Sequence, residues 1–455
     1  MPLSVIILAA GRGTRMKSAL PKVLHPLGGR PLLAHVIDTA SQLAAHSINI
    51  VHGHGGEAVR QAVASEALSW RLQHEQLGTG HAVDQALPTI DDGDTVLVLY
   101  GDMALVRVAT LRALLADVDR HALSLLSVNL DDPTGYGRIV RDDNDDVARI
   151  VEERDADDDI RAIREVNTGF LAARAGALKG WLSRVGNNNA KGEYYLTDCI
   201  EIAVADGHKV SAILCADPGE ALGVNDKAQL AAAERVYQLR QAEKLMRGGV
   251  TLRDPARIDV RGDLSAGRDV EIDVNVIFAG RVELGDNVRI GANCIISDCA
   301  IGAATEVLPN CIIEDSEVGA RCRVGPFARL RPGNTLADQV HIGNFVEAKK
   351  STLGKGSKAN HLSYIGDSEI GERVNVGAGT ITCNYDGASK HRTVIGDDVF
   401  VGSDTQLVAP VTVGAGATIA AGSTINKDVA AGDLALSRAR QTIVKAWDRP
   451  RKGKR

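Results

Sequence analysis

Apolar residues in the first half of the chain form short β-rich runs that alternate with helical stretches. VIILAA (residues 5–10) predicts a buried strand, PLLAHVIDTASQLAAH (31–46) a helix and INIVHG (48–53) the next strand. TVLVLYGD (95–102) predicts another apolar strand, followed by the helical TLRALLADV (110–118). Alternating strands and helices predict a Rossmann-like α/β domain with a mostly parallel sheet covered by helices on both faces.

A long segment of different composition follows this domain. Residues 226–246 are rich in Ala, Leu, Gln, Glu, Lys and Arg, which are good helix formers, and two glycines then end the segment. We therefore expect a linker helix in residues 226–249. It would join the α/β domain (1–225) to a second domain (250–455).

The second domain carries a six-residue repeat of apolar anchors. The repeat is seen in three series: Ile272, Phe278, Leu284, Ile290 and Ile296; Val318, Val324, Leu330, Leu336 and Ile342; and Ile395, Val401, Leu407, Val413, Ile419 and Ile425. A small or β-branched residue stands two positions before many anchors, as Val399 and Thr405 do. Each hexad supplies a short strand with two inward side chains. Because one short strand cannot bury its own face, the strands are expected to stack into a parallel coil.

The register of the repeat slips in a few places in the second domain, and one slip bears on function. Val376 and Ile395 are 19 residues apart, where three hexads would need 18. The segment between them includes TITCNYDGASKHRT (380–393), which we expect to project as a loop. Projecting loops on repeat proteins are common binding sites.

Composition excludes several classes of protein. The 455 residues carry a net charge of −6 and only 3 % aromatic residues, which argues against a nucleic-acid or membrane partner. Seven cysteines without a CxxC pair indicate reduced thiols in a cytoplasmic protein rather than disulfides or a thiolate zinc site. The apolar N-terminal run has no basic residue before it and predicts no signal peptide. The basic tail RPRKGKR (449–455) is expected to be disordered.

A Gly-rich segment, LAAGRGTRM (8–16), follows the first strand. It lacks the GK[ST] of a Walker A motif and the third glycine of the dinucleotide-binding motif. What remains is a turn between a strand and a predicted helix, where backbone N–H groups can bind phosphate near Arg12, Arg15 and Lys22. From this segment alone, a tight turn with incidental basic residues is an equally good interpretation.

A carboxylate follows a later strand of the same domain. Asp102 lies at the carboxyl end of a predicted parallel strand, where open α/β sheets bind their ligands. Its oxygen atoms suit Mg²⁺ beside phosphates. A helix N-cap or turn residue is the alternative role for Asp102.

Ordered motifs along the chain carry a resemblance to a known family. AAGRGTRM, PKVL, EQLGTGHA and YGD resemble the sugar-phosphate nucleotidylyltransferases. TGYGRI, VNTG, NNNAKGEYYLTD, GPFARLRPG, NFVEAKK, GAGTITCNYDG and GSDTQLVAPV extend the resemblance to its bifunctional bacterial members. Those members join an N-acetylglucosamine-1-phosphate uridyltransferase to a glucosamine-1-phosphate acetyltransferase. The resemblance covers Val5 to about Arg438.

The resemblance implies a uridylyl-transfer site in the α/β domain, with Mg²⁺ as cofactor. The residues implied to bind UTP are Leu8, Ala9, Ala10, Gly11, Lys22, Gln73, Gly78, Thr79, Tyr100, Gly101 and Asp102. Arg15 and Lys22 would offset phosphate charge as catalytic residues, and Gly137, Glu152, Asn167 and Asn225 would bind the sugar phosphate. Asp102 and Asn225 would hold the metal. The family usually has GDxPL, but Ala104 replaces the proline here, which frees one backbone φ and removes no ligand.

Acetyl transfer needs a base, and histidine suits this role because it titrates near neutral pH. His361 falls outside the inward positions set by the anchors Ala359 and Ile365, and a surface histidine on a coil corner is the alternative. The resemblance makes His361 the catalytic base, with Glu347 orienting it. It further implies sugar-phosphate binding by Arg331, Lys349, Tyr364 and Asn375, and acetyl-coenzyme A binding by Ala378, Asn384, Tyr385, Ser403, Ala421 and Arg438.

The resemblance also implies a left-handed parallel β-helix of hexapeptide repeats, a homotrimer and small-molecule substrates. Two other functions remain open at this point. In one, the chain transfers only nucleotidyl groups, and the coil is an oligomerising scaffold. In the other, the chain is a regulatory subunit that has lost its chemistry, although its Gly-rich loop and Asp102 are intact.

Overall fold

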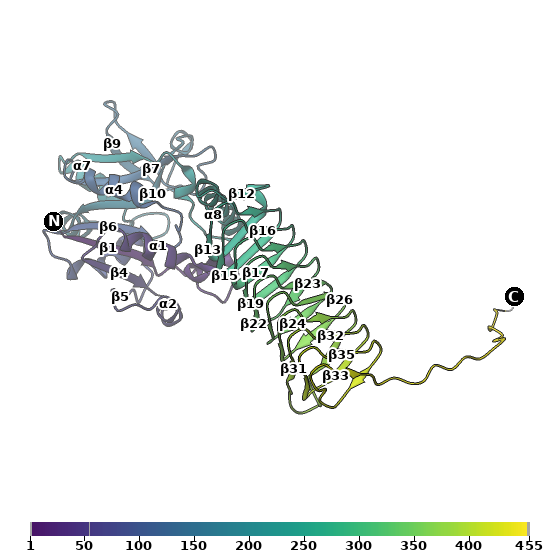
Figure 1. Cartoon of the computed structure of the whole chain (residues 1–455). Coiled ribbons are helices and arrows are strands. Elements are labelled where there is room, and N and C mark those ends of the chain that lie inside the picture. The colour runs from purple at the N-terminus through teal and green to yellow at the C-terminus, as the bar shows by residue number, and fades with distance from the viewer. Residues whose placement is uncertain (1, 54, 453–455) are drawn as a thin grey trace. The chain divides into compact units, whose positions relative to one another are not determined.

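The computed structural model describes residues 2–53 and 55–452 and divides into two compact units, Met1–Gln238 and Leu239–Arg455. Figure 1 shows a mixed α/β unit and a coil of stacked strands. Within the described residues, no helix is long and apolar enough to span a membrane.

The N-terminal unit is built on one sheet with the strand order β11-β7-β10-β6-β1-β4-β5, to which β8 and β9 are added beside β10. Its strands are β1 (Leu3–Ala9), β4 (Ser47–His52), β5 (Leu68–Leu72), β6 (Thr95–Tyr100), β7 (Leu123–Asn129), β8 (Arg138–Arg141), β9 (Val147–Val151), β10 (Glu165–Arg174) and β11 (Val210–Leu214), with the small hairpin β2 (Pro26–Leu27) and β3 (Arg30–Pro31) outside the sheet. The pairs β1–β4, β1–β6, β4–β5 and β7–β11 are parallel, whereas β10 is antiparallel to β6 and β7. The sheet is therefore mostly parallel, as predicted.

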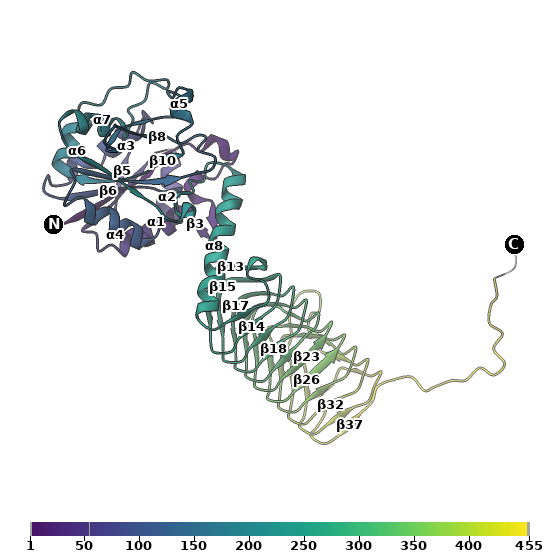
Figure 2. The same ribbon diagram turned by 90° about the horizontal axis from the view of Figure 1, so that it is seen from above.

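Helices cover both faces of this sheet (Figure 2). They are α1 (Leu32–Ser41), α2 (Gly56–Ala62), α3 (Thr79–Asp84), α4 (Val108–Asp117), α5 (Asp158–Arg161), α6 (Ala175–Leu182) and α7 (Asp198–Ala205). Successive side chains of β1 enter opposite cores: Ile7 packs with α1 and α4, whereas Ile6 packs with α6 and α7. This alternation follows from the period of two along a strand.

The Gly-rich turn differs from the prediction in one respect. No α-helix follows it; the chain makes only the short 3₁₀ turn η1 (Thr14–Met16). Gly13 and Lys17, at the two ends of this turn, have left-handed φ values of 60° and 47°, which an α-helix does not continue through. Phosphate binding by a helix N-terminus is therefore excluded here, and only the backbone of the turn is available.

A 21-residue helix, α8 (Lys227–Arg247), spans the boundary between the two units. The side chains of Asp226 and Gln229 cap its start: Gln229 N–H donates to Asp226 Oδ1 (2.8 Å), and Gln229 Oε1 accepts from Asn225 N–H (2.8 Å). Asp226 therefore supplies the N-cap, and the side chain of Asn225 is not used for capping.

The C-terminal unit is a parallel β-helix with three faces. Face one contains β12 (Thr251–Leu252), β14 (Glu271–Ile272), β16 (Arg289–Ile290), β18 (Glu306–Val307), β20 (Arg323–Val324), β23 (His341–Asn344), β26 (Lys358–His361), β29 (Asn375–Val376), β32 (Phe400–Val401), β35 (Thr418–Ile419) and β37 (Leu434–Ala435). Face two contains β21 (Arg329–Leu330), β24 (Glu347–Lys349), β27 (Tyr364–Gly366), β30 (Ile381–Cys383), β33 (Gln406–Val408) and β36 (Thr424–Ile425), and face three contains β22 (Asn334–Leu336), β25 (Thr352–Leu353), β28 (Ser368–Ile370), β31 (Thr393–Ile395) and β34 (Val411–Val413). The longer strands β13 (Ile258–Ala266), β15 (Val276–Leu284), β17 (Ile295–Ile301) and β19 (Ile312–Val318) run through the corner between faces two and three.

Both predicted inward positions of the hexads are buried. Val401 and the preceding Val399 are at most 1 % exposed, and so are Leu407 and Thr405. These side chains belong to one continuous core inside the coil. The hexads thus stack as predicted, and hydrophobic burial by neighbouring coils stabilises each short strand.

The slip in the repeat marks an insertion larger than one residue. Ile370 pairs with Ile395, 25 residues later, whereas Ile395 pairs with Val413, 18 residues later. The coil therefore carries seven extra residues, and a slip of seven looks like a slip of one in a six-residue repeat. Nearly all side chains from 385 to 392 are exposed, and the predicted loop is present.

One corner of the coil carries an exposed apolar ridge. Phe327, Phe345 and Leu362, which we call the corner ridge, lie between faces one and two with φ near +50° and are 50–64 % exposed. The two aromatic rings stack with centroids 5.4 Å apart. Residues 449–452 of the basic tail are exposed without regular secondary structure, and 453–455 lie outside the described residues.

Candidate active sites

A cavity of about 570 Å³ lies at the carboxyl ends of β1 and β6 in the N-terminal unit. Ten of the predicted UTP-binding residues line it: Leu8, Ala9, Ala10, Gly11, Lys22, Gln73, Gly78, Thr79, Tyr100 and Asp102. The backbone of Gly101 lies behind it, with its N–H donating to Leu8 O (2.9 Å). The structure therefore brings together segments that are far apart in the sequence, because parallel strands end at one edge of a sheet.

Lys22 is the centre of the polar contacts in this cavity. Its ammonium group forms an ion pair with Asp102 and donates a hydrogen bond to Asn225 Oδ1 at 3.2 Å. A carboxylate oxygen and an amide oxygen thus converge on one cation. Both are hard oxygen donors, so they also fit a divalent cation such as Mg²⁺. Arg15, the other predicted catalytic cation, is exposed and does not line the cavity.

Sequence reasoning missed several residues that line the cavity, among them Gln76 and Glu193. Arg12, which was noted only for its charge, also lines it and donates from Nε to Gln76 Oε1 (3.2 Å). Gln73 donates from Nε2 to Gly78 O (3.1 Å), so its side chain is fixed within the cavity wall. Glu193 belongs to the motif NNNAKGEYYLTD, and that motif was the available signal for it.

The predicted sugar-binding residues lie together beside β8, β9 and β10. Asn167 N–H donates to Gly137 O (2.8 Å), and the Asn167 side chain accepts from Gly169 N–H (3.0 Å). Glu152 accepts a hydrogen bond from Thr197 Oγ1 (3.2 Å). Thr197 and Asn167 also line a small recess with the aromatic ring of Tyr100.

Partly buried acids lie on this side of the site. Burial raises the pKa of Glu152, and burial together with the nearby Glu152, Glu201 and Asp155 carboxylates raises the pKa of Asp198 to about 6. Burial likewise raises the pKa of the Tyr100 phenol. Desolvation of these groups strengthens the charge interactions on this side of the site.

In the β-helix, three cations gather on face two. Arg331 donates from Nη1 to Glu347 Oε1 (3.0 Å). Lys349 lies beside Lys390, and this neighbour is the largest cause that lowers the pKa of Lys349, followed by desolvation and by Arg331. Crowded positive charge favours a bound anion. Lys390 was not predicted as a site residue, although it lies in the projecting loop.

Hydrogen bonds within the projecting loop fix its shape. Asp386 accepts from the backbone N–H groups of Ala388 (2.8 Å) and Ser389 (2.7 Å) and contacts His391 Nε2 (2.7 Å). Tyr385 and Lys390 form an antiparallel bridge across the loop. These contacts set the position of Lys390 beside face two.

Tyr364 and Asn384 join this group, whereas Asn375 does not. Asn384 Nδ2 donates to Tyr364 Oη (3.5 Å) and to Asp367. Tyr364 is on face two, next in register to Glu347, while Asn375 is on face one. The corner ridge separates these two faces. Within one chain, the predicted acetyl-site residues are therefore divided between two sides of a corner.

His361 lies at that corner and is exposed. Its Nδ1 forms a 2.9 Å hydrogen bond with Asn344 Oδ1. Glu347, which the resemblance makes the residue that orients His361, has its carboxylate paired with Arg331 in this structure, so that role stays a prediction. Asn344 belongs to the quoted motif NFVEAKK but was not singled out.

The predicted coenzyme A residues follow the same corner toward the C-terminus. Ala378 and Ser403 occupy positions equivalent to His361, since Gly379 N–H donates to His361 O (3.3 Å) and Asp404 N–H to Ala378 O (2.7 Å). Ala421 follows in the same column, and Arg438 Nη1 donates to its carbonyl (2.8 Å). Tyr385 is exposed at the start of the loop.

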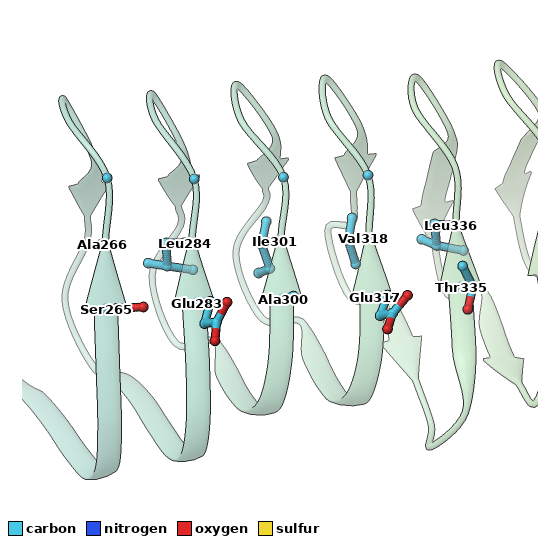
Figure 3. A pocket seen from close by; sticks show the side chains of 14 residues that line it. Ser265, Ala266, Glu283, Leu284, Ala300, Ile301, Glu317, Val318, Thr335 and Leu336 are labelled. Carbon is cyan, nitrogen blue, oxygen red and sulfur yellow. The ribbon is translucent and has the colours of Figure 1, made fainter.

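A cavity of about 600 Å³ on the β-helix is lined by none of the predicted site residues. It is a shallow groove along successive coils near the corner that follows face three (Figure 3). Leu284, Ile301 and Val318 supply its floor, and Glu283 and Glu317 its polar edge. Its lining repeats from coil to coil, as the fold itself does, and it gathers no convergent set of chemical groups.

Comparison with known proteins identifies two family regions. A MobA-like NTP transferase domain matches residues 5–161, and the bacterial transferase hexapeptide family (six repeats) matches residues 392–427. The first region contains the Gly-rich turn and Asp102. The second contains the end of the projecting loop and Ser403.

Curated relatives match nearly the whole chain. "Bifunctional protein GlmU" of Aromatoleum aromaticum is 60 % identical over 99 % of both chains. Proteins of the same name from Azoarcus sp. and Alkalilimnicola ehrlichii are 58 % and 57 % identical over 98 % of this chain and 99 % and 96 % of theirs.

Proposed function

This chain belongs to the GlmU family of bifunctional proteins, and from that premise we propose that it makes UDP-N-acetylglucosamine in two steps. Acetyl-coenzyme A first acetylates glucosamine 1-phosphate in the β-helix, and UTP then uridylylates the N-acetylglucosamine 1-phosphate in the N-terminal unit. Family membership confirms the predicted bifunctional enzyme and its α/β plus β-helix fold. The observation that supports both activities is the presence, on one chain, of a nucleotide-sized cavity in the N-terminal unit and, in the β-helix, of a cation cluster on face two with an exposed histidine at the adjoining corner.

In uridylyl transfer, the sugar phosphate attacks the α-phosphate of UTP and pyrophosphate leaves. Gln73, Gly78 and Thr79 line the part of the cavity where side-chain and backbone hydrogen bonds can bind the uracil ring. The backbone of the Gly-rich turn binds phosphate oxygens, and Lys22 offsets the charge that builds on the transferred and leaving oxygens. Arg15, exposed within the 3₁₀ turn, would offset the charge of the leaving pyrophosphate.

Asp102 and Asn225 would hold Mg²⁺. Among residues 2–53 and 55–452, no group of three or more His, Cys, Asp and Glu side chains could hold a metal ion, so phosphate and water must supply the remaining ligands. Bound there, the ion would neutralise charge on the phosphates. Lys22, which contacts both residues, would then be released toward the triphosphate.

The sugar is held between β8 and α7. Glu152 and Asn167 present a carboxylate and an amide for sugar hydroxyls, and the backbone of Gly137 forms the adjacent wall. An added Cβ at Gly137 would lie 2.9 Å from Ile150 Cγ2. A side chain at this position would therefore reduce the space available to the sugar. Orientation of the phosphate by these contacts supplies much of the rate, since phosphoryl transfer depends mainly on positioning.

In acetyl transfer, the amine nitrogen of glucosamine 1-phosphate attacks the thioester carbonyl of acetyl-coenzyme A. His361 Nε2 accepts the amine proton as the N–C bond forms, and this proton neutralises the departing thiolate. Arg331, Lys349 and Lys390 bind the sugar phosphate, with Tyr364 and Asn375 on the sugar. Ala378, Ser403, Ala421 and Arg438, which follow His361 along the corner, bind the coenzyme together with Asn384 and Tyr385.

A homotrimer would complete this second site. The predicted residues are divided between faces one and two, and the exposed corner ridge of Phe327, Phe345 and Leu362 lies between them. Exposed apolar ridges of this kind mark interfaces. A neighbouring β-helix packed against the ridge would bring its own face toward His361 and close the site.

A paired assay tests the proposal on the wild type, His361→Ala and Asp102→Ala. One arm measures thiol release from acetyl-coenzyme A with glucosamine 1-phosphate, and the other measures pyrophosphate release from UTP, Mg²⁺ and N-acetylglucosamine 1-phosphate. We expect His361→Ala to lower acetyl transfer by about 10²- to 10⁴-fold, the usual contribution of a general base, and to spare uridylyl transfer. Asp102→Ala should do the reverse.

His46→Ala and Asp143→Ala, at exposed positions, are the matched controls. A wild type that releases pyrophosphate but never thiol would make the coil a scaffold, as in the first alternative. A wild type that does neither would favour the regulatory subunit.

A further inference from the structure

The hydrogen bond between His361 and Asn344 joins two equivalent corner positions on successive coils. β23 and β26 pair in register with Asn344 opposite His361, and the side-chain contact between Nδ1 and Oδ1 is 2.9 Å long. We propose that Asn344 is a residue that positions His361, an inference that rests on the acetyl transfer proposed above. Its side-chain oxygen fixes the His361 tautomer whose Nε2 accepts the substrate proton.

The tautomer follows from the partner atom. An amide oxygen only accepts hydrogen bonds, so Nδ1 of His361 must carry the proton that it donates to Asn344. In the neutral ring, the lone pair is then on Nε2. A partner that accepts at Nδ1 therefore selects the tautomer with the base at the outer nitrogen, and it also fixes the plane of an otherwise exposed ring.

The coil itself does not require asparagine at this corner. Ala378 and Ala421 occupy the same column on later coils. The backbone bond that links the coils here, Leu362 N–H to Asn344 O (3.1 Å), does not involve the Asn344 side chain. A purely structural role would be filled equally well by alanine, so the amide is explained by what it contacts.

The charged groups near His361 do not compete for Nδ1. Glu347, on face two, is paired with Arg331. His341, on the same coil as Asn344, is the titratable neighbour on face one, and burial, Arg323 and Lys358 lower its pKa. Asn344 thus orients His361 without adding a negative charge, whereas a carboxylate there would favour the protonated ring, which cannot act as a base.

The experiment compares the acetyl transfer of wild-type enzyme, Asn344→Ala and Asn344→Asp over pH 6–9. For Asn344→Ala we expect kcat to fall about 10- to 100-fold, by analogy with the loss seen when the hydrogen-bond partner of a metal-binding histidine is removed. KM for both substrates should change much less, and uridylyl transfer should not change. Thr335→Ala, outward-facing on face three, is the matched control for the coil.

Asn344→Asp separates an accepting role from a donating one. Aspartate can still accept from Nδ1–H, so this variant should retain more activity than alanine at high pH, with the acidic limb of its kcat profile moved to higher pH. If the asparagine were turned to donate its NH₂ to Nδ1, aspartate would be as inactive as alanine across the range, and the proposal would be overturned.

A readout independent of activity is the ¹⁵N spectrum of histidine-labelled protein. The His361 signals, assigned by their loss in His361→Ala, should show a protonated Nδ1 in the wild type and a mixture of tautomers in Asn344→Ala. An Nε2–H signal in the wild type would refute the proposal.

The outcomes distinguish this inference from the function on which it rests. If His361→Ala keeps acetyl transfer, the proposed base is wrong. If His361→Ala is inactive while Asn344→Ala stays within about twofold of the wild type, a loss far below that expected for such a partner, only the role of Asn344 is refuted. Should Asn344→Ala misfold, judged by lost uridylyl activity and melting temperature, the Asn344→Asp profile and the wild-type spectrum still decide.

Discussion

Replacing Asp198 by asparagine should stabilise the N-terminal unit at neutral pH. Asp198 lies in the first turn of α7, partly buried near Glu152, Glu201 and Asp155, and its pKa is raised from 3.8 to about 6. A helix N-terminus alone would lower this pKa. Burial and the neighbouring carboxylates outweigh the helix dipole, so the ionised form of Asp198 is a source of instability.

The sign of the pH dependence follows from the two pKa values. Below pH 3.8, Asp198 is protonated in both folded and unfolded chains and contributes nothing. Between pH 3.8 and 6, the unfolded chain releases the proton while the folded chain keeps it, so the stability of the folded state falls as the pH rises. Above pH 6 the full cost remains, at most about 3 kcal/mol for a shift of this size. Partial solvent exposure reduces it to about 1 kcal/mol.

Asparagine has nearly the same shape and no charge at any of these pH values. At pH 7.5 we expect Asp198→Asn to raise the melting temperature of the N-terminal unit by about 2–4 °C, the shift that about 1 kcal/mol gives for a unit of this length. This increase in melting temperature should become smaller between pH 6 and pH 4 and disappear below pH 4. Trp181 is buried in this unit at 3 % exposure, and its fluorescence reports the unfolding.

The control for net charge is Asp143→Asn, which removes one charge from an exposed loop. An equal gain for Asp198→Asn at pH 4 and pH 7.5 would refute the electrostatic argument, because the charge could not be its source. A lower melting temperature at pH 7.5 would show that the Asp198 carboxylate makes a favourable contact.

Two further predictions concern the β-helix. Lys390→Ala should raise KM for glucosamine 1-phosphate in the acetyl reaction, because it removes one of three clustered cations. Steady-state kinetics at low and high salt measure this effect. An unchanged KM would show that the sugar phosphate binds elsewhere. Ile296→Ala removes a side chain that is 0 % exposed in the coil and should destabilise the β-helix by about 2–5 kcal/mol. On heating, acetyl activity should be lost at a lower temperature than in the wild type, while uridylyl activity should be lost at the same temperature as in the wild type. A parallel loss of both activities would contradict this prediction.

The repeating features of this fold could be predicted because they are local and periodic. Val399 and Val401 are inward for the same reason as every equivalent pair: each hexad must bury two side chains against its neighbours. The size of the insertion before Ile395 was not visible, because seven residues and one residue shift a period of six alike. The 3₁₀ turn after the Gly-rich loop was missed because the left-handed Lys17 has no distinct sequence signal.

The sites depended on contacts that no periodicity records. Lys22 contacts Asp102 and Asn225, which are 80 and 203 residues away in the sequence, respectively. These residues come together because the parallel strands end, and α8 begins, at one edge of the sheet. The hydrogen-bond partner of His361 was easier to predict from the sequence, because Asn344 stands 17 residues earlier, about one coil away. The spacing indicated which positions stack on successive coils, but only the side-chain directions showed that Asn344 contacts His361.

By itself, then, the amino-acid sequence determined the alternation of the sheet unit, the hexads of the coil and the motifs of its family, since each depends on neighbouring residues and a fixed period. Tertiary structure alone decided which charges meet. An ion pair such as Lys22–Asp102 needs two side chains within a few ångströms of each other, and only the packing of distant segments sets that distance.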